Sequence, residues 1–163
     1  MGDTDHSTPG LSLQEAMASA RPVIEQIVWC TLATVSPDGA PRCRIVHPIW
    51  DWDTATGWIT SRATPLRRRH LAHQSLVSCS YWSPAHDAAF VDCRAEWVRG
   101  EDRRRVWERC LEIDPPMGFD PTPMFPGGPD DPGFAPMSLQ PTRIRVTIAA
   151  EMSAGRPPLL WTA

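Results

Sequence analysis

The sequence predicts a mainly β protein in which six short antiparallel strands, with flanking helices, close into a small barrel. Three observations support this fold class. Short runs of apolar and β-branched residues recur along the chain, turn-forming residues separate these runs, and 163 residues with 42% hydrophobic content can bury one core. We therefore expect a single domain over residues 11–163 and a disordered N-terminus over residues 1–10.

The first elements are a helix and a hairpin. We expect a short helix over residues 12–20 that ends before Pro22, because a residue preceding proline avoids the helical region. A strand over residues 29–35 then meets a Pro-Asp-Gly turn, in which proline presets φ and glycine accepts a positive φ. The returning strand covers residues 42–50, and Pro48 within it indicates an edge, a bulge or a strand end.

The returning strand also carries charge. Alternation places Arg42 and Arg44 on one face with Val46, and Ile45 and His47 on the other. The remaining expected elements are strands over residues 58–61, 76–82, 90–99 and 143–148, a helix from Thr64-Pro65 to about residue 73, and a helix over residues 101–113.

Residues 114–136 form a segment rich in proline and glycine. Its eight prolines and four glycines disfavour regular structure, yet it also contains Met117, Phe119, Phe125 and Phe134. These apolar side chains predict a loop that is docked on the domain rather than a free linker.

Composition excludes several classes of function. A net charge of −3 argues against a general nucleic-acid binder, and no segment has the apolar length of a membrane span, so we expect neither partner. The five cysteines lack a close pair, and His70 and His73 lack a third ligand, so no metal site is predicted. Free thiols and an acidic N-terminus without signal-peptide character favour the cytoplasm.

The region around residue 64 suits a phosphate. Thr64 is a good N-cap and Pro65 suits the first helical position, so the helix start offers free N–H groups and the positive end of the helix dipole. Arg62 and Arg67 lie beside it, and Arg44 on the neighbouring strand would complete a clamp.

A simpler explanation competes with this one. Exposed arginines commonly form surface ion pairs of little energetic value. In the run Arg67-Arg68-Arg69, only one or two side chains can face a single phosphate, because consecutive helical residues diverge by about 100°. For His47, a role as a hydrogen-bonded strand histidine is favoured over catalysis, and no catalytic residue is predicted.

Three segments carry a family resemblance: residues 29–41, residues 42–46, and residues 58–64 with Arg67. They resemble the pyridoxamine 5'-phosphate oxidase-like family, the FMN-binding split barrels, and the likeness extends over residues 12–163. The Pro-Gly-Gly-Pro-Asp segment at 126–130 and the ending at Trp161 resemble small actinobacterial members. The resemblance implies a six-stranded split β-barrel and a homodimer that holds FMN between its subunits and acts on a small-molecule substrate.

The resemblance also implies roles for individual residues. They are Arg44, Thr64 and Arg67 for the phosphate, the backbone of Ile45, Val46 and His47 for the ring, Thr60 and Ser61 for its polar edge, and Trp161 near the partner's flavin, while Arg62 is assigned to the cofactor from its place beside the helix start. Polar residues that the family offers from the partner's strand fall near Ala88 and Ala89 here, so the flavin edge would be held differently. The family's arginine–histidine pair that binds the vitamin substrate near the C-terminus has no equivalent, so pyridoxamine phosphate itself is disfavoured as the substrate.

Three functions remain open at this level. The preferred one is an enzyme, an FMN-binding oxidoreductase acting on an unidentified small molecule. The second is a reductase dependent on the deazaflavin coenzyme F-420, whose longer acidic tail would contact Arg62, Arg67, Arg68 and Arg69 together. The third is a non-enzymatic flavin- or haem-binding carrier.

Overall fold

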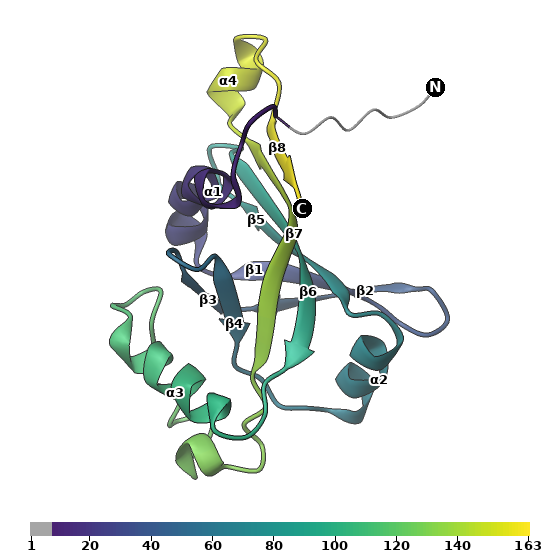
Figure 1. The fold of residues 1–163 in the computed structure, drawn as a ribbon, viewed down its shortest axis with the longest axis vertical. Helices are drawn as coiled ribbons and strands as arrows, with labels where there is room; N and C mark the ends of the chain where they lie inside the picture. Colours follow the sequence, from purple (N-terminus) through teal and green to yellow (C-terminus); the bar gives the residue numbers. More distant parts are fainter. Residues whose placement is uncertain (1–7) are drawn as a thin grey trace.

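The computed structural model describes residues 8–163 and confirms the mainly β fold class (Figure 1). Its elements in chain order are α1 (Leu13–Ile27), β1 (Cys30–Val35), β2 (Pro41–Val46), β3 (Pro48–Asp51), β4 (Thr56–Ile59), α2 (Pro65–His73), β5 (Leu76–Trp82), β6 (Ala88–Trp97), α3 (Asp102–Glu112), η1 (Gly128–Asp130), β7 (Met137–Thr147), α4 (Ala149–Ser153) and β8 (Leu159–Thr162). All pairings among these strands are antiparallel.

The strands form one sheet in the order β2-β1-β5-β6-β7-β4-β3, with β8 paired to β7. Strands β2 and β3 are consecutive in the chain but lie at opposite ends of this order, with only His47 between them. The sheet must therefore curl so that its two edges meet at His47. The result is a split barrel.

The described residues contain eight strands rather than the predicted six. The predicted strand 42–50 divides at His47, because Pro48 has no amide N–H with which to continue the first ladder. The C-terminal segment supplies β8, whose short apolar run was not predicted as a strand. Strand β7 is longer than predicted, since the sheet tolerates Pro141 beside a register shift opposite Asp92 and Cys93.

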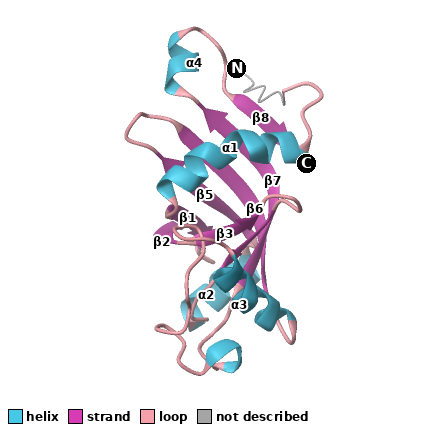
Figure 2. Cartoon of the chain, turned by 90° about the vertical axis from the view of Figure 1, so that its left-hand side faces the viewer, coloured by secondary structure: helices cyan, strands magenta, loops and turns pink. Residues whose placement is uncertain are grey.

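The first helix is also longer than predicted. It begins at the Ser12 N-cap with a capping box to Glu15, but it continues through Pro22 to Ile27 instead of ending near residue 20. Its buried face packs across β5, β6 and β7 (Figure 2). Burial of that face offsets the hydrogen bond that proline removes from the helix.

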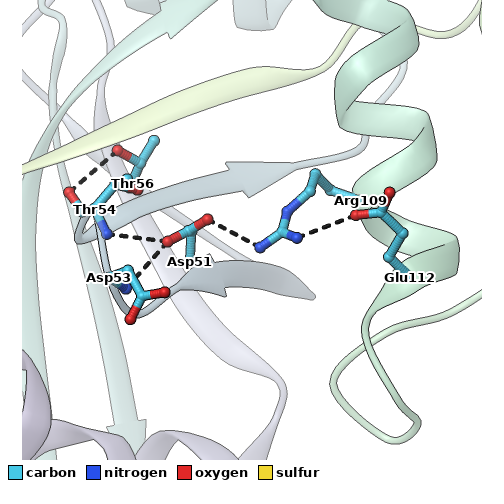
Figure 3. A network of polar contacts seen from close by, with 6 residues as sticks. All are labelled: Asp51, Asp53, Thr54, Thr56, Arg109 and Glu112. Carbon is cyan, nitrogen blue, oxygen red and sulfur yellow. Dashed lines mark hydrogen bonds and ion pairs between the residues drawn. The ribbon is translucent and has the colours of Figure 1, made fainter.

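A second, smaller core lies under the segment 114–136, below the main barrel. It joins β3, α3 and the loop through the buried residues Ile49, Val106, Trp107, Cys110, Phe125 and Phe134. Arg109 of α3 also bridges Asp51 at the end of β3 and Glu112 on its own helix (Figure 3). Helix α3 is therefore fixed to the sheet by both apolar and polar contacts.

The predicted disordered segment 1–10 lies for the most part outside the described residues. Within the described part, Thr8 exchanges hydrogen bonds with Leu160 of β8 through its amide and its hydroxyl. No helix within residues 8–163 is both long and apolar enough to cross a membrane.

Candidate functional site

A groove of about 670 Å³ lies between the sheet and the docked loop. Its volume falls within the range of roughly 300–1,000 Å³ that is typical of small-molecule sites. The sheet side and the start of α2 contribute Trp29, Ile45, Val46, His47, Thr60, Ser61, Arg62, Thr64 and Arg67, and the loop contributes Phe119, Pro123, Met124 and Phe125.

Eight of the sequence-predicted cofactor residues line this groove, namely Ile45, Val46, His47, Thr60, Ser61, Arg62, Thr64 and Arg67. Two do not. Arg44 lies behind the groove, in a small cavity that it shares with Arg67, and Trp161 packs on the main core from β8. One chain therefore brings eight of the ten predicted residues together around the groove, with Arg44 in the adjoining cavity and Trp161 elsewhere.

Arg67 connects the groove to the interior cavity, since it lines both. Its Nη1 donates to the carbonyl of Arg62 at 3.3 Å, and burial together with the charge of Arg44 lowers the pKa of Arg67. Among the described residues, neither Arg44 nor Arg67 has a carboxylate within ion-pair distance. Arg67 in the groove, with the unpaired charge of Arg44 beside it in the interior cavity, is a good site for an anion.

A buried polar chain supports Arg44 from behind. Its Nη1 donates to the Thr34 hydroxyl at 3.1 Å, and the same oxygen lies 3.2 Å from Nδ1 of His70. Nε2 of His70 is buried without a partner, and burial, followed by the charges of Arg44, Arg42 and Arg69, lowers its pKa. A neutral His70 therefore adds no further positive charge behind the two arginines.

His47 joins the sheet to the loop. Its Nε2 lies 3.0 Å from the carbonyl of Met117, so this nitrogen carries the proton and donates. The ring lies between Trp29 and Phe119, with centroids 5.0 and 4.7 Å away. Burial lowers the pKa of His47, although the bond to Met117 acts in the opposite direction.

The loop is held at two further points. Nη2 of Arg62 donates to the carbonyl of Met124 at 2.7 Å, and its guanidinium lies 5.3 Å from the centre of the Phe125 ring. The Ser61 hydroxyl donates to the carbonyl of Ala135, whose amide donates to the carbonyl of Ser61. Arg62 and Ser61 thus shape the groove by holding its loop wall.

Helix α2 starts as the sequence predicts. Thr64 is the N-cap and accepts from the amide of Arg67 at 3.3 Å, with Pro65 at the first position. Arg68 and Arg69, in contrast, do not line the groove. The expectation that four arginines act together there is therefore not met by the geometry of one chain.

Residue-level reasoning missed part of the groove. Trp29 and the loop residues Phe119, Pro123, Met124 and Phe125 were not predicted to line it. The apolar side chains in the proline-rich segment indicated that the loop docks on the domain, but nothing local in the sequence indicates which surface it covers.

The comparisons identify the fold through structure alone. No family model matches the chain, and neither does any curated protein sequence. One similar structure is a Clostridium acetobutylicum protein related to general stress protein 26, of the pyridoxinephosphate oxidase family. It superposes with a TM-score of 0.70 at 9% identity, over 91% of this chain and 95% of that one. A pyridoxamine 5'-phosphate oxidase-related, FMN binding protein from Nostoc punctiforme gives 0.56 at 15%, over 84% of each chain.

Two other similar structures differ in what they bind or use. A heme binding protein from Mycobacterium smegmatis gives a TM-score of 0.67 at 18% identity over 90% of this chain, but only 57% of that chain is covered. An F420 reductase gives 0.56 at 21% identity, over 76% of this chain and 94% of that one. The chain therefore has the fold of the pyridoxamine 5'-phosphate oxidase-like, FMN-binding split-barrel proteins, as the resemblance in its sequence predicts.

Proposed function

We propose that the groove binds FMN and that the protein is an FMN-dependent oxidoreductase acting on a small molecule. The observation that carries this proposal is Arg67, a guanidinium group in a groove of suitable size, with Arg44 beside it in the adjoining small cavity and, among the described residues, no carboxylate partner on either. Bound flavin would supply hydride and electron transfer, which no side chain of the groove can supply alone.

The groove residues fit the parts of FMN. Arg67, supported by Arg44, would neutralise the phosphate, and the start of α2 would add its dipole. The strand at Ile45 and Val46 would support the flat ring through its backbone, and Thr60 would offer a hydroxyl to the polar edge. The loop wall, with Phe119 and Phe125, would exclude water and select the substrate.

We also propose that the protein acts as a homodimer. Trp29, Ile45 and Trp82 are 55%, 64% and 60% exposed, although large apolar side chains of this kind favour burial. Trp29 and Ile45 line the groove, so a second subunit that covers them would also close the site, and its Trp161 is the proposed aromatic contact. Sedimentation analysis should give twice the monomer mass, and Ile45→Arg should shift the protein toward monomer.

The phosphate clamp is tested by Arg67→Ala. Loss of a hydrogen-bonded charge should weaken FMN binding by about 1.5–3 kcal/mol, measured by titration of the apo-protein with flavin fluorescence as the readout. The matched control is Arg69→Ala, two positions along the same helix and outside the groove. Equal FMN affinity in Arg67→Ala and the control would overturn the clamp.

The deazaflavin coenzyme F-420 is a second candidate, and the similarity to an F420 reductase supports it. Its tail is longer and more acidic than the FMN phosphate, so it would have to leave the groove to reach Arg68 or Arg69. Parallel titrations with the two coenzymes decide between them. Tighter binding of F-420, weakened by Arg68→Ala or Arg69→Ala, would favour the deazaflavin reductase.

A carrier without turnover is a third candidate, supported by the similarity to a heme binding protein. A carrier should bind its ligand and yet leave a reduced flavin unoxidised in the presence of quinone, nitro or dye acceptors. Haem uptake with a Soret band, together with an absence of flavin binding, would favour it over the enzyme.

A further inference from the structure

A second cavity, separate from the groove, is lined by residues from α2, the end of β6 and the start of α3. It has a volume of about 230 Å³, the space of several water molecules. Arginines from three different elements line it: Arg68 from α2, Arg99 from the turn after β6, and Arg103 from the first turn of α3.

These three charges lack compensation. No carboxylate lines the cavity, and none of the three arginines belongs to an ion pair among the described residues. The acidic group near Arg103 is Asp131, and its carboxylate accepts from the amides of Gly127 and Gly133. These two bonds and the nearby charges of Arg62 and Arg103 lower the pKa of Asp131.

Arg103 is held in place with part of its guanidinium unused. Its Nη2 donates to the carbonyl of Asp131 at 2.7 Å, and its Nε is buried without any partner. A buried donor that makes no hydrogen bond is costly, and since this Nε is closed to solvent, a ligand in the cavity would bind at the Nη side of the guanidinium.

Aromatic rings position two of the arginines. Arg68 lies 5.6 Å from the centre of the Trp97 ring, and Arg103 lies 5.7 Å from that of Phe134. Such contacts use the faces of the guanidinium groups and leave their N–H edges available. The element that carries Arg103 is itself anchored, since Arg109 ties α3 to Asp51 (Figure 3).

Another groove, which borders this cavity and is not the cofactor groove, has a different balance of charge. It shares Trp97 and Arg99 with the cavity, but Glu96 and Asp102 also line it, and Asp102 pairs with Arg105 at 3.0 Å. Positive charge is compensated there by the chain itself. In the cavity of Arg68, Arg99 and Arg103, no carboxylate of the described residues makes such a pair, which leaves their remaining N–H groups available to an anionic ligand.

We propose that this cavity binds the phosphoryl group of a small molecule, at a site distinct from the cofactor groove. Three planar guanidinium groups, which approach from different elements, can donate hydrogen bonds to the oxygens of a phosphate. The start of α3 adds the positive end of its helix dipole. The site does not depend on FMN binding.

The test uses the full chain carrying Arg67→Ala, which removes the main cation of the groove. Inorganic phosphate is titrated at constant ionic strength, and the arginine Nε–H resonances are followed by NMR. Saturable shifts should include Arg103, and Arg68→Gln or Arg99→Gln should each weaken binding about tenfold or more. Both replaced side chains are exposed, so the fold should survive.

The matched control is Arg105→Gln, on the same helix but paired with Asp102, which should change the affinity for phosphate less than twofold. Unsaturable shifts, or equal affinity in Arg68→Gln, Arg99→Gln and the control, would overturn the site. Tighter binding of citrate than of phosphate would overturn its assignment to a phosphoryl group. Because the groove arginine is already replaced, failure here leaves the proposed FMN clamp untouched.

Discussion

The two walls of the groove are built in different ways. On the sheet wall, Ile45 and Val46 belong to β2 and are held by pairing with Thr31 and Cys30 of β1. The loop wall between residues 114 and 136 has only a three-residue 3-10 turn, and it is held by the small core below it and a few side-chain bonds to carbonyls.

This difference separates two tasks. The sheet wall cannot move without breaking a ladder that continues into the main core, so it can hold a cofactor in fixed geometry. The loop wall can change in sequence or open locally at smaller cost, so it is the part suited to substrate selection. We therefore expect substitutions in the loop to change substrate range before they change cofactor affinity.

The largest expected effect is that of Phe125→Ala. Phe125 is buried, packs edge-on against Phe134 at 5.2 Å between centroids, and also lines the groove. Removing it should lower the free energy of unfolding by about 3–5 kcal/mol, measured by urea denaturation.

The matched control is the preceding residue. Met124 is exposed, so Met124→Ala should change the stability by no more than about 0.5 kcal/mol. If Phe125→Ala were as stable as Met124→Ala, the loop wall would not be a packed part of the domain.

Most of the sheet wall could be predicted from the sequence. Period-two alternation placed Arg44 and Ile45 on opposite faces, and the pair Thr64-Pro65 predicted the helix start as it is observed. These signals are local, because a strand and an N-cap are specified by neighbouring residues. The full length of helix α1 was not predicted, because burial of Val23 and Ile24 against the sheet stabilises the helix beyond Pro22.

The position of the loop wall could not be predicted from such local signals. The prolines and phenylalanines of residues 114–136 predict docking but not its target, which depends on contacts such as that between Met117 and His47, 70 residues apart. The buried partnership of Thr34 with His70 is likewise non-local, at a separation of 36 residues. Periodicity carries no information on such pairs.

The second prediction concerns pH and His47. The unfolded chain should protonate His47 near its ordinary pKa of about 6.5, whereas burial holds the pKa of the folded residue lower. Below about pH 6.5 the unfolded state therefore binds more protons, and stability should fall as pH falls, by at most about 1.4 kcal/mol per pH unit for this group. Above that pH its contribution should be constant.

His70 has a lowered pKa as well, so its contribution to the pH dependence has the same sign. The measurement is therefore a comparison of unfolding curves between pH 5 and 8 for the wild type, His47→Gln and His73→Gln. His47→Gln should reduce the change of the unfolding free energy with pH. His73→Gln, at an exposed position, should leave that change as it is in the wild type. Parallel profiles for all three proteins would mean that His47 does not couple the loop to the sheet.

The smallest expected effect separates a hydrogen bond to the loop backbone from an exposed ion pair within the loop wall. Arg62→Gln removes the bond to the carbonyl of Met124 and should weaken loop docking by about 0.5–1.5 kcal/mol, seen as faster hydrogen exchange of the Phe125 amide. Arg104→Gln removes only an exposed ion pair with Asp130 and should leave that exchange nearly unchanged. If both variants accelerate exchange equally, long-range charge would hold the loop; if only Arg62→Gln does, its contact with one carbonyl and one ring is what fixes the movable wall.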